Sequence, residues 1–428
     1  MMMKKLCVLV CPMDWGLGHA SRCVPVIKAF LAAGCRVLVG VSGPGGELIR
    51  REFGMTGTPV TAGQNGVAGQ PDKVPCRDML QIIPFPGFSV TSYRKYFLQG
   101  LLLRVPAFLR HISMEKRILG ELVEKYSPDL IVSDNRYGLV HERVTSVIIT
   151  HQLRPSMPLL LRPLEGLVSV VIRGWTGAFD ECWIPDCADD PAAGRLTAGH
   201  ERLPAAFFTG WLSRFSPEAC RNSGPPGNPE PPGTGAYSEK FRYRFLFLLS
   251  GPEPHRTTLE DMVKAGIGGL TEKALLVRGL PGSFPEREIR GNLEIVSFVD
   301  SGGLLKAIRE SEMIVCRSGY SSVMDLLALG RTAVLVPTPG QTEQEYLGRW
   351  LASKGWFRVV RQKDFDMQKL IARQREGFAG DEAGRAHTGF GGSRAELQKR
   401  PIAHKLLLEQ RVKDVLRKAS GACGRSKS

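Results

Sequence analysis

Residues 313–325 read MIVCRSGYSSVMD, and residues 332–337 read TAVLVP. The two apolar runs predict buried strands, and the segment between them predicts a tight turn followed by a helix. A helix that opens on glycine and serine directly after a strand presents free backbone N–H groups and the positive end of its dipole, and both favour a phosphate group. Asp325 comes about two turns along that helix, where its carboxylate could accept hydrogen bonds from vicinal hydroxyls. The stretch therefore predicts a nucleotide site in an α/β fold.

The polar residues of this stretch also carry a resemblance. The run 316–319 (Cys-Arg-Ser-Gly), the acid six residues after its glycine, and the pair 344–345 after the second strand resemble the donor-binding domain of family 28 glycosyltransferases in order and spacing. The resemblance implies the GT-B fold, an α/β fold of two facing Rossmann-like domains with a cleft between them. An ordinary strand–turn–helix unit would explain the hydrophobic pattern but not this polar set. The donor-binding residues that the resemblance implies are Ser250, Gly251, Phe298, Arg317, Ser318, Gly319, Tyr320, Ser321, Asp325, Gln344 and Glu345.

Two departures from the family pattern concern the donor. Pro252 and Pro254 stand in the glycine loop after the strand at 244–249, where they offer no backbone N–H groups to a diphosphate. Glu345 stands where the family's lipid II enzyme has a second glutamine. A carboxylate accepts hydrogen bonds from sugar hydroxyls but cannot donate one to an N-acetyl carbonyl. The sequence therefore does not specify N-acetylglucosamine as the transferred sugar.

The start of the chain predicts a second Rossmann-like unit. Residues 6–11 form an apolar strand, residues 14–22 (DWGLGHASR) a glycine-rich loop, and a helix follows to about residue 33. Dinucleotide binding is the first alternative for such a loop. Ser21 replaces the third glycine of that fingerprint, and the next strand ends in Ser42-Gly43 without an acid for the adenosine ribose. These two differences disfavour NAD binding.

His19 is the predicted base of this loop. Gly18-His19, with Pro25 six residues later, matches the N-terminal domain of the glycosyltransferase family, whose loop lies on the acceptor side and would include Gly16 as well. The dipole at a helix N-terminus disfavours the imidazolium, so a histidine there stays neutral and can take a proton near pH 7. Glycosyl transfer to a hydroxyl needs such a base. The alternative is that His19 only caps the helix or binds phosphate.

Further polar residues follow two more predicted strands of the first domain. Asp134, Asn135 and Arg136 end the strand that begins at residue 129, and His151 follows the strand at 146–150. Ligands of doubly wound sheets bind at the carboxyl ends of strands, so these residues are acceptor-side candidates. Asp134 could orient His19, as a carboxylate does in the related plant-type glycosyltransferases. A turn-capping aspartate is the other interpretation.

Length and charge suggest two domains and an anionic partner. The 428 residues carry a net charge of +15, and the pattern predicts an N-terminal domain at 1–213, a linker at 214–242, a nucleotide-sugar domain at 243–366 and a basic, partly helical tail at 367–428. Residues 82–111 mix leucine and aromatic residues with arginine and lysine, which fits helices lying on an anionic membrane surface. Leucines in a core beside a solvated basic face would give the same pattern. Nucleic acid is not expected, because no aromatic and basic platform of a known module is present.

Cysteine usage and the N-terminus indicate the compartment. The ten cysteines include no C-x-x-C pair, and the apolar run after Lys5 is too short for export or for spanning a membrane. We therefore expect a reduced cytoplasmic protein, peripheral on the inner face of the cell membrane.

The predicted function is that of an inverting, hexosyltransferase-type glycosyltransferase that moves a sugar from a UDP-sugar to a hydroxyl of a lipid-linked or glycan acceptor. His19 would deprotonate the acceptor while Arg317 and the 318–319 turn stabilise the departing diphosphate. Neither loop has an Asp-x-Asp cluster, so the prediction includes no metal and no cofactor. The rival hypotheses are a sugar-nucleotide epimerase of the same fold and a non-catalytic nucleotide-sugar-binding subunit.

Overall fold

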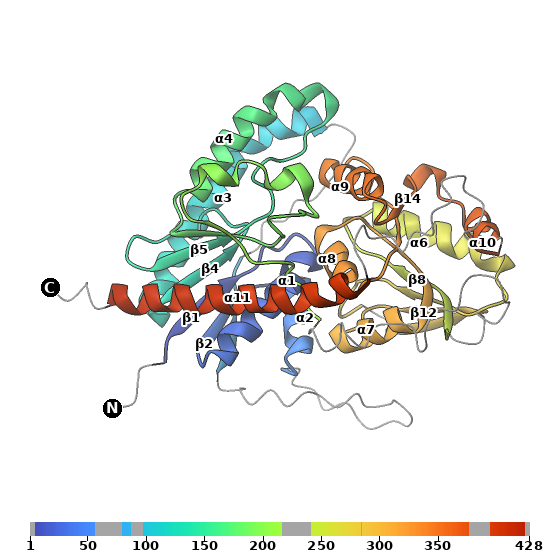
Figure 1. The fold of residues 1–428 in the computed structure, drawn as a ribbon, viewed down its shortest axis with the longest axis horizontal. Coiled ribbons are helices and arrows are strands. Elements are labelled where there is room, and N and C mark those ends of the chain that lie inside the picture. Colours follow the sequence, from blue (N-terminus) through green and yellow to red (C-terminus); the bar gives the residue numbers. More distant parts are fainter. Residues whose placement is uncertain are drawn as a thin grey trace. The chain divides into compact units, whose positions relative to one another are not determined.

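The computed structural model describes residues 5–55, 79–86, 97–215, 241–283, 285–375 and 394–423. They divide into two compact units (Figure 1). The first unit comprises Met1–Pro155, Pro163–Arg214 and His404–Ser428, and the second comprises Ser156–Arg162 and Phe215–Ala403. The predicted linker core at 216–240, and residues 87–96 of the predicted membrane segment, lie outside the described residues.

The first unit is built on a seven-stranded parallel sheet. In spatial order its strands are β3 (Leu80–Ile83), β2 (Arg36–Gly40), β1 (Cys7–Cys11), β4 (Leu130–Asp134), β5 (Thr145–Ile149), β6 (Glu181–Ile184) and β7 (Ala206–Phe208). Its helices are α1 (Leu17–Ala32), α2 (Gly43–Glu52), α3 (Phe97–Tyr126) and α4 (Glu165–Thr176), with short 3-10 turns η2 (Gly194–Thr197) and η3 (His200–Arg202). The 3-10 turn η1 (Leu159–Leu164) begins in the second unit and ends in the first.

The strand order explains where a ligand can bind to this sheet. β1 and β4 are buried along their whole length, as expected for central parallel strands covered on both faces. The chain leaves β1 toward β2 on one side and later returns to place β4 on the other side, so the order reverses at β1. The register pairs Cys11 with Ser133, so the loops that follow these two strands start at the same edge. That edge is the topological switch point, where open α/β sheets bind ligands.

The second unit repeats this architecture around β8. In spatial order its strands are β10 (Arg287–Arg290), β11 (Leu293–Val296), β9 (Ala274–Val277), β8 (Tyr243–Leu248), β12 (Ser311–Cys316), β13 (Val334–Leu335) and β14 (Arg358–Val359), and only β10 is antiparallel to its neighbour. The helices are α6 (His255–Gly266), α7 (Ser301–Arg309), α8 (Tyr320–Ala328), α9 (Thr342–Ser353) and α10 (Met367–Arg375), with 3-10 turns η5 (Ile267–Gly269) and η6 (Gln362–Asp364). The prediction of two Rossmann-like domains is thus confirmed.

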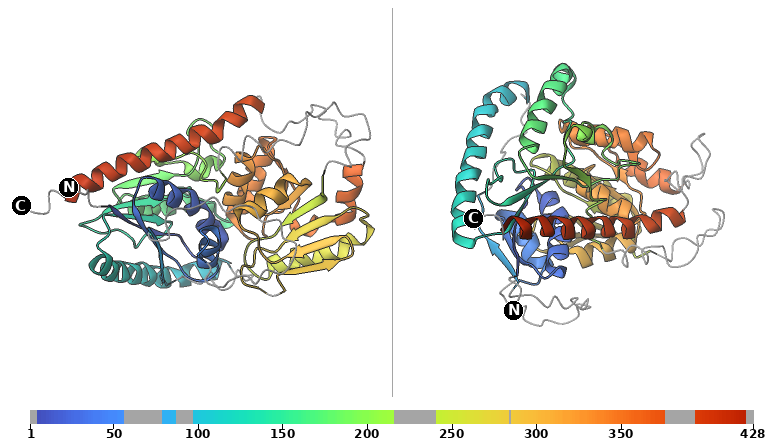
Figure 2. Two further views of the ribbon diagram at one scale, coloured as in Figure 1. Left: turned by 90° about the horizontal axis from the view of Figure 1, so that it is seen from below. Right: turned by 60° about the vertical axis from the view of Figure 1, so that its left-hand side comes forward.

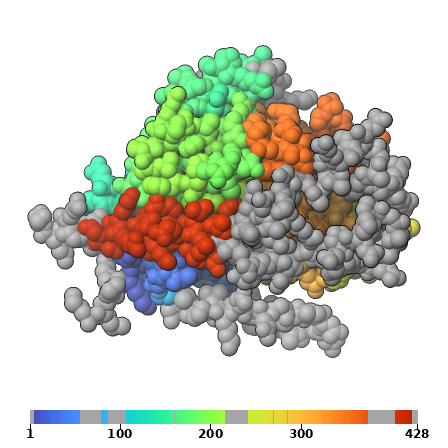
Figure 3. All heavy atoms as spheres, viewed as in Figure 1, coloured from blue at the N-terminus to red at the C-terminus, as the bar shows by residue number. Residues whose placement is uncertain are grey.

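The last helix, α11 (Arg394–Cys423), lies within the partly helical tail predicted at 367–428, and from residue 404 on it belongs to the first unit. No local pattern in residues 367–428 predicts this return to the first unit. The apolar side chains of Leu408, Val412 and Val415 are buried. Lys418 donates to Glu181, a buried acid of β6, at 2.5 Å. Figure 2 and Figure 3 show α11 lying along this unit.

In the part of the chain that the structure describes, no helix has both the length and the apolar composition to cross a bilayer.

Candidate active site

A buried carboxylate connects three elements of the first unit. Gly16 adopts a left-handed φ of 75° at the start of α1, a conformation that suits glycine, and so turns the chain from β1 into the helix that carries His19. His19 Nδ1 lies 3.1 Å from Asp134 Oδ2, at the end of β4. Arg22, one turn further along α1, donates from Nε to the same oxygen at 2.8 Å and from Nη2 to Oδ1. The predicted pairing of His19 with Asp134 is therefore present, together with an arginine that the prediction lacked.

The charges around Asp134 keep it ionised. Burial alone would raise its pKa, but the positive charge of Arg22 and the hydrogen bonds from Arg22 and His19 hold the pKa of Asp134 well below its usual range. The side chain is fully buried, so the ion pair is shielded from solvent. Asp134 is therefore a permanent acceptor at neutral pH.

The ionised carboxylate determines the tautomer of His19. Asp134 can only accept, so the 3.1 Å contact requires a proton on Nδ1. Arg22 Nη2 also lies 3.0 Å from Nδ1, but a guanidinium cannot donate to a protonated nitrogen, and Nη2 already has Asp134 Oδ1 as its acceptor. The lone pair of His19 is therefore on Nε2. The side chain is 16% exposed, so this ring can be reached from solvent.

His151 joins the cluster from β5. Arg22 Nη1 lies 3.0 Å from His151 Nδ1, and since an arginine only donates, His151 accepts at that nitrogen. Arg22 thus links α1 to the ends of β4 and β5. The sequence signal that could have identified Arg22 is its position three residues after His19, on the same face of the helix.

Asn135 and Arg136 have different surroundings. Asn135 has a left-handed φ of 56°, and its Oδ1 is buried without a hydrogen-bond partner among the described residues. Arg136 is buried and donates inward, to the Pro12 carbonyl at 2.9 Å, to Glu115 at 3.0 Å and to Asp14 at 2.7 Å. Its contacts fix the loop that leads to Gly16.

In the second unit, Arg317 joins the carboxyl ends of three neighbouring strands. It follows β12 and donates to the His255 carbonyl, beyond β8, at 2.5 Å and to the Val336 carbonyl, beyond β13, at 3.0 Å. Its Nε is buried and has no partner among the described residues. Burial lowers the pKa of Arg317 to about 10, which still leaves it charged at neutral pH.

The turn after Arg317 is tied to the first turn of α9, which in turn holds the loop before that helix. Ser318 Oγ donates to the Gln344 carbonyl at 2.8 Å, and the Gln344 side-chain oxygen accepts from the Thr338 N–H at 2.9 Å. The amide NH₂ of Gln344 is then its donor end. Glu345 accepts from the Gly340 N–H at 3.0 Å, so one of its oxygens holds this loop.

The structure brings most of the predicted donor residues to one edge of the second sheet. Gly251 has a left-handed φ of 102°, and a Cβ there would lie 3.5 Å from Thr338 Oγ1, so the Ser250-Gly251 loop approaches the loop after β13. Gly319 precedes α8 as its N-cap, and α8 carries Tyr320, Ser321 and the buried Asp325. Phe298 lies apart from this group, after β11, which is two strands away from β8.

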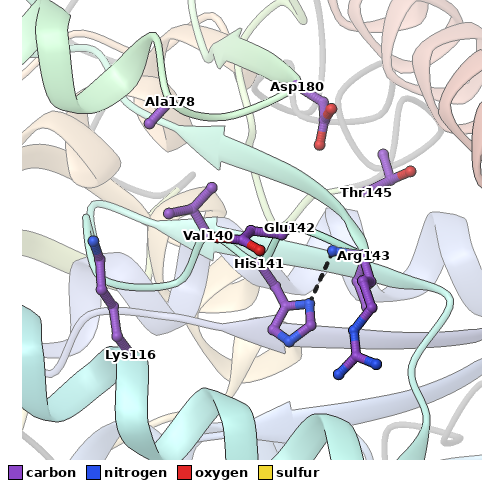
Figure 4. A pocket seen from close by; sticks show the side chains of 9 residues that line it. Lys116, Val140, His141, Glu142, Arg143, Thr145, Ala178 and Asp180 are labelled. Atoms are coloured by element: carbon purple, nitrogen blue, oxygen red, sulfur yellow. Dashed lines mark hydrogen bonds between the residues drawn. The ribbon is translucent and has the colours of Figure 1, made fainter.

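A pocket of about 630 Å³ lies at the other end of the first sheet (Figure 4). Its lining includes Thr145, where β5 begins, and Asp180, directly before β6, together with His141 and Lys116. The amino ends of parallel strands are not where such sheets bind ligands, so this pocket is separate from the Asp134 cluster.

This chain resembles known proteins in sequence and in fold. Residues 282–389 match the model of the glycosyltransferase family 28 C-terminal domain. The chain is a glycosyltransferase with a family 28 C-terminal domain. An uncharacterized glycosyltransferase of Methanosarcina acetivorans is 26% identical to this glycosyltransferase over 369 residues, 82% of each chain.

Bacterial relatives match over a shorter part of the enzyme. The UDP-N-acetylglucosamine--N-acetylmuramyl-(pentapeptide) pyrophosphoryl-undecaprenol N-acetylglucosamine transferase of Nitratidesulfovibrio vulgaris is 30% identical over 139 residues, 30% of this chain and 37% of that protein. Among solved structures, Arabidopsis thaliana UGT89C1 complexed with UDP-L-rhamnose has a TM-score of 0.56 at 13% identity, covering 97% of this chain and 100% of that one. The calicheamicin glycosyltransferase CalG4 has a TM-score of 0.55 at 14% identity and full coverage of both chains. These structures support the fold.

The Asp134→Asn variant tests the buried ion pair. It leaves the Arg22 guanidinium buried without its counter-charge, so we expect a loss of about 3–5 kcal/mol in the free energy of unfolding at pH 7. The folded-state pKa of Asp134 is depressed, so its stabilisation exists above the unfolded-state value of about 4 and is lost as the pH falls below it. The variant should accordingly lose less stability than the wild type on acidification. Denaturant titrations between pH 3 and pH 7 measure both effects.

The control for this prediction is Glu310→Gln, which removes a partly exposed acid that pairs with the exposed Arg242 and Lys306. Exposed pairs contribute about 0–1 kcal/mol, so this variant should unfold almost like the wild type. Equal stability losses in the two variants would contradict the role assigned to Asp134.

Proposed function

We propose that this glycosyltransferase transfers a sugar from a UDP-sugar to a hydroxyl of a lipid-linked acceptor, with inversion at the anomeric carbon. The observation that carries the proposal is the hydrogen bond between His19 and the ionised Asp134, since it leaves Nε2 of a partly exposed histidine as a base at the ligand-binding edge of the first sheet.

In the proposed reaction, His19 Nε2 takes the proton of the acceptor hydroxyl. The oxygen then forms a bond to the anomeric carbon from the side opposite the diphosphate. The bond between that carbon and the diphosphate oxygen breaks, and its electron pair leaves with UDP. Asp134 stabilises the imidazolium that forms, and the positive end of α8 and the charge of Arg317 favour the anionic leaving group.

The proposal that the donor is a UDP-sugar rests on the names of the relatives and on Asp325 of α8. The bacterial relative is named for transfer from UDP-N-acetylglucosamine, and the plant structure was solved with UDP-L-rhamnose. Asp325 is the carboxylate expected to hold the ribose hydroxyls. Since Glu345 replaces an amide of the lipid II enzyme, the transferred sugar stays open between an N-acetylhexosamine and a simple hexose.

The Asp325→Asn variant tests the donor site. Hydrogen bonds to a charged group contribute about 1.5–3 kcal/mol, so UDP should bind about 10- to 100-fold more weakly to this variant. Inorganic pyrophosphate has no ribose and should bind both proteins equally. Calorimetric titration with UDP, GDP, TDP and pyrophosphate measures these affinities. If pyrophosphate binding weakens as much as UDP binding, Asp325 acts on the fold of the site and not on the ribose.

The His19→Ala variant tests the base. A general base contributes about 10²–10⁴-fold to the rate, so sugar transfer should fall by that factor while the affinity for UDP stays near that of the wild type. UDP release in the presence and absence of membrane extract measures transfer, and calorimetry measures UDP affinity.

His141→Ala is the matched control, because His141 lies in the pocket at the opposite end of the same sheet. It should transfer sugar at the wild-type rate. If UDP affinity falls as far as the rate in His19→Ala, then His19 binds the donor and the base is another residue. If no free UDP is released in the presence of acceptor, the epimerase is favoured.

Helix α4 buries polar side chains and exposes apolar ones, and this arrangement supports a membrane-proximal acceptor. The buried residues of α4 are the polar Glu165, Ser169 and Thr176. Its large apolar residues face outward, with Leu167 64% and Val170 56% exposed. A water-facing helix has the reverse arrangement. The outward apolar residues of this face are Leu164, Leu167, Val170 and Val171.

The charges beside this apolar face are positive. Phe108 of α3 packs on Trp175 of α4 with ring centroids 5.6 Å apart, so the two helices lie side by side, as Figure 1 also shows. The acids of α4 and of residues 97–117 of α3 are Glu165 and Glu115. Both are buried, where Glu165 accepts from Arg195 at 2.9 Å and Glu115 accepts from Arg136 at 3.0 Å.

The charges that remain exposed on α3 there, including Arg110 and Lys116, are basic. An apolar face with a basic margin fits the interface of an anionic membrane. The sequence predicts a membrane surface at residues 82–111. Of the described residues in that range, α3 contributes the exposed Leu109, and α4 supplies the larger apolar face.

The double variant Leu167→Asp/Val170→Asp tests this surface. Burying each of these side chains contributes about 1.5–3 kcal/mol, so the variant should bind vesicles of phosphatidylglycerol at least 10-fold more weakly than the wild type. Vesicle co-sedimentation measures the binding, with phosphatidylcholine vesicles as the uncharged comparison.

The control is Ile289→Asp/Leu406→Asp, which places the same two charges at positions that are 66% and 60% exposed. This control should bind vesicles like the wild type. Equal loss in both double variants would show that net charge, and not the α4 face, decides the binding.

A further inference from the structure

A cysteine and a histidine meet where α11 joins the first unit. Cys187 follows β6, and its Sγ lies 3.1 Å from His404 Nε2. The backbone of Cys187 is fixed by the neighbouring Asp186, which is fully buried and accepts from the N–H groups of Cys187, Ala192 and Ala193 at 2.8–2.9 Å. The sulfur therefore has a defined position opposite the imidazole.

His404 is held as firmly as the sulfur. Its ring packs edge-on against Trp211 with centroids 4.6 Å apart. Gly210, at a φ of 72°, lies so close that a Cβ there would come within 2.6 Å of His404 Cβ. The side chain is buried, so the ring has little room to turn away from Cys187. A thiol is a weak donor and Nε2 can accept, so the proton can pass from sulfur to nitrogen.

Cys187 differs from the other cysteines whose side chains the structure describes. Burial raises the pKa of the Cys11, Cys182 and Cys316 thiols to about 12, and these thiols are closed to reagents. Cys187 is half-buried. It thus combines access with a base, which is the setting of reactive cysteines.

We propose that Cys187 and His404 form a thiolate–imidazolium pair, and that Cys187 is a modification site whose adducts loosen α11 from the first unit. The thiolate attacks one sulfur of a small disulfide. A new S–S bond forms, the old one breaks, and the second sulfur leaves as a thiolate. The adduct needs the space beside Cys187, so His404 is displaced from Gly210 and Trp211.

Other charges near the pair do not replace His404. The acids of the same loop are Asp186, Asp189 and Asp190, and they disfavour a thiolate while favouring the imidazolium. On the side of α11, Lys405 follows His404 with an exposed side chain that pairs with Glu409 at 4.0 Å. In strand β6, Glu181 is occupied by Trp183 and Lys418. The reactivity of Cys187 therefore depends on His404.

The first test measures alkylation of the full chain by iodoacetamide, with mass spectrometry resolving each cysteine. The thiolate sulfur displaces iodide, and a new S–C bond forms. At pH 7, Cys187 should react at least about 10-fold faster than Cys11, Cys182 and Cys316. Its rate should reach half of its maximum clearly below pH 8.5, the ordinary thiol value. A midpoint at or above 8.5 in the wild type overturns the proposal.

The matched variant is His404→Phe, which keeps an aromatic ring against Trp211 but removes the base. Its Cys187 should react about 10-fold more slowly than the wild type at pH 7 and equally fast at pH 10, where every accessible thiol is ionised. Equal rates at pH 7 would overturn the pair. A difference that persists at pH 10 would show that the histidine acts on access alone, which also overturns it.

The second test follows α11. Hydrogen exchange of residues 404–415 should become faster when the wild type is treated with glutathione disulfide, and should stay unchanged in Cys187→Ser given the same treatment. Unchanged exchange in the fully modified wild type would overturn the link to α11. Cys187→Ser should keep wild-type transfer activity, since neither Cys187 nor His404 belongs to the site proposed for transfer.

Discussion

The Asp134 carboxylate is the constraint on which the first unit's chemistry depends. It is buried at the end of a central strand, and it remains charged only because Arg22 reaches it from α1. Asp134 in turn fixes the proton of His19 on Nδ1. Removing Arg22 or Asp134 leaves a buried charge or changes the tautomer, so the proposed base, His19, cannot be tuned separately from the local fold. Arg22 also donates to His151, which extends the same constraint to β5.

The second unit also contains a buried cation, Arg317, but its partners differ from those of Arg22. Arg317 donates to two backbone carbonyls, and among the described residues no carboxylate pairs with it. A carbonyl dipole offsets less of a positive charge than a carboxylate does, so part of the charge of Arg317 stays uncompensated. That suits the proposed diphosphate site, because a diphosphate would supply the missing negative charge. One unit thus contains a neutralised ion pair that holds His19, the proposed base, and the other contains a buried positive charge at the proposed diphosphate site.

The sequence predicted that His19 and Asp134 lie at the same edge of the sheet, but it did not predict that Arg22 contacts them. His19 and Asp134 are 115 residues apart, yet both follow central strands of a parallel sheet, and the rule for strand ends brought them together. Arg22 was missed because an arginine on a helix is ordinarily solvated, and only the tertiary contact shows it buried. The α4 face was missed because periodicity reveals two faces but not which one points inward. His404 lies against Gly210, which comes 194 residues earlier in the chain, and no local sequence pattern predicts such a contact.

The surface charge of the α3 and α4 region follows from the same burial of acids. Glu115 pairs with Arg136 and Glu165 pairs with Arg195 inside the first unit. These two acids are therefore not available to neutralise the basic residues on the nearby surface. A count of residues therefore understates how positive this region is. The same inward pairing explains why α4 turns its polar side to the protein, since Glu165 must reach Arg195. The apolar residues on the opposite face of α4 then point outward, and the proposed membrane contact would give them an apolar environment.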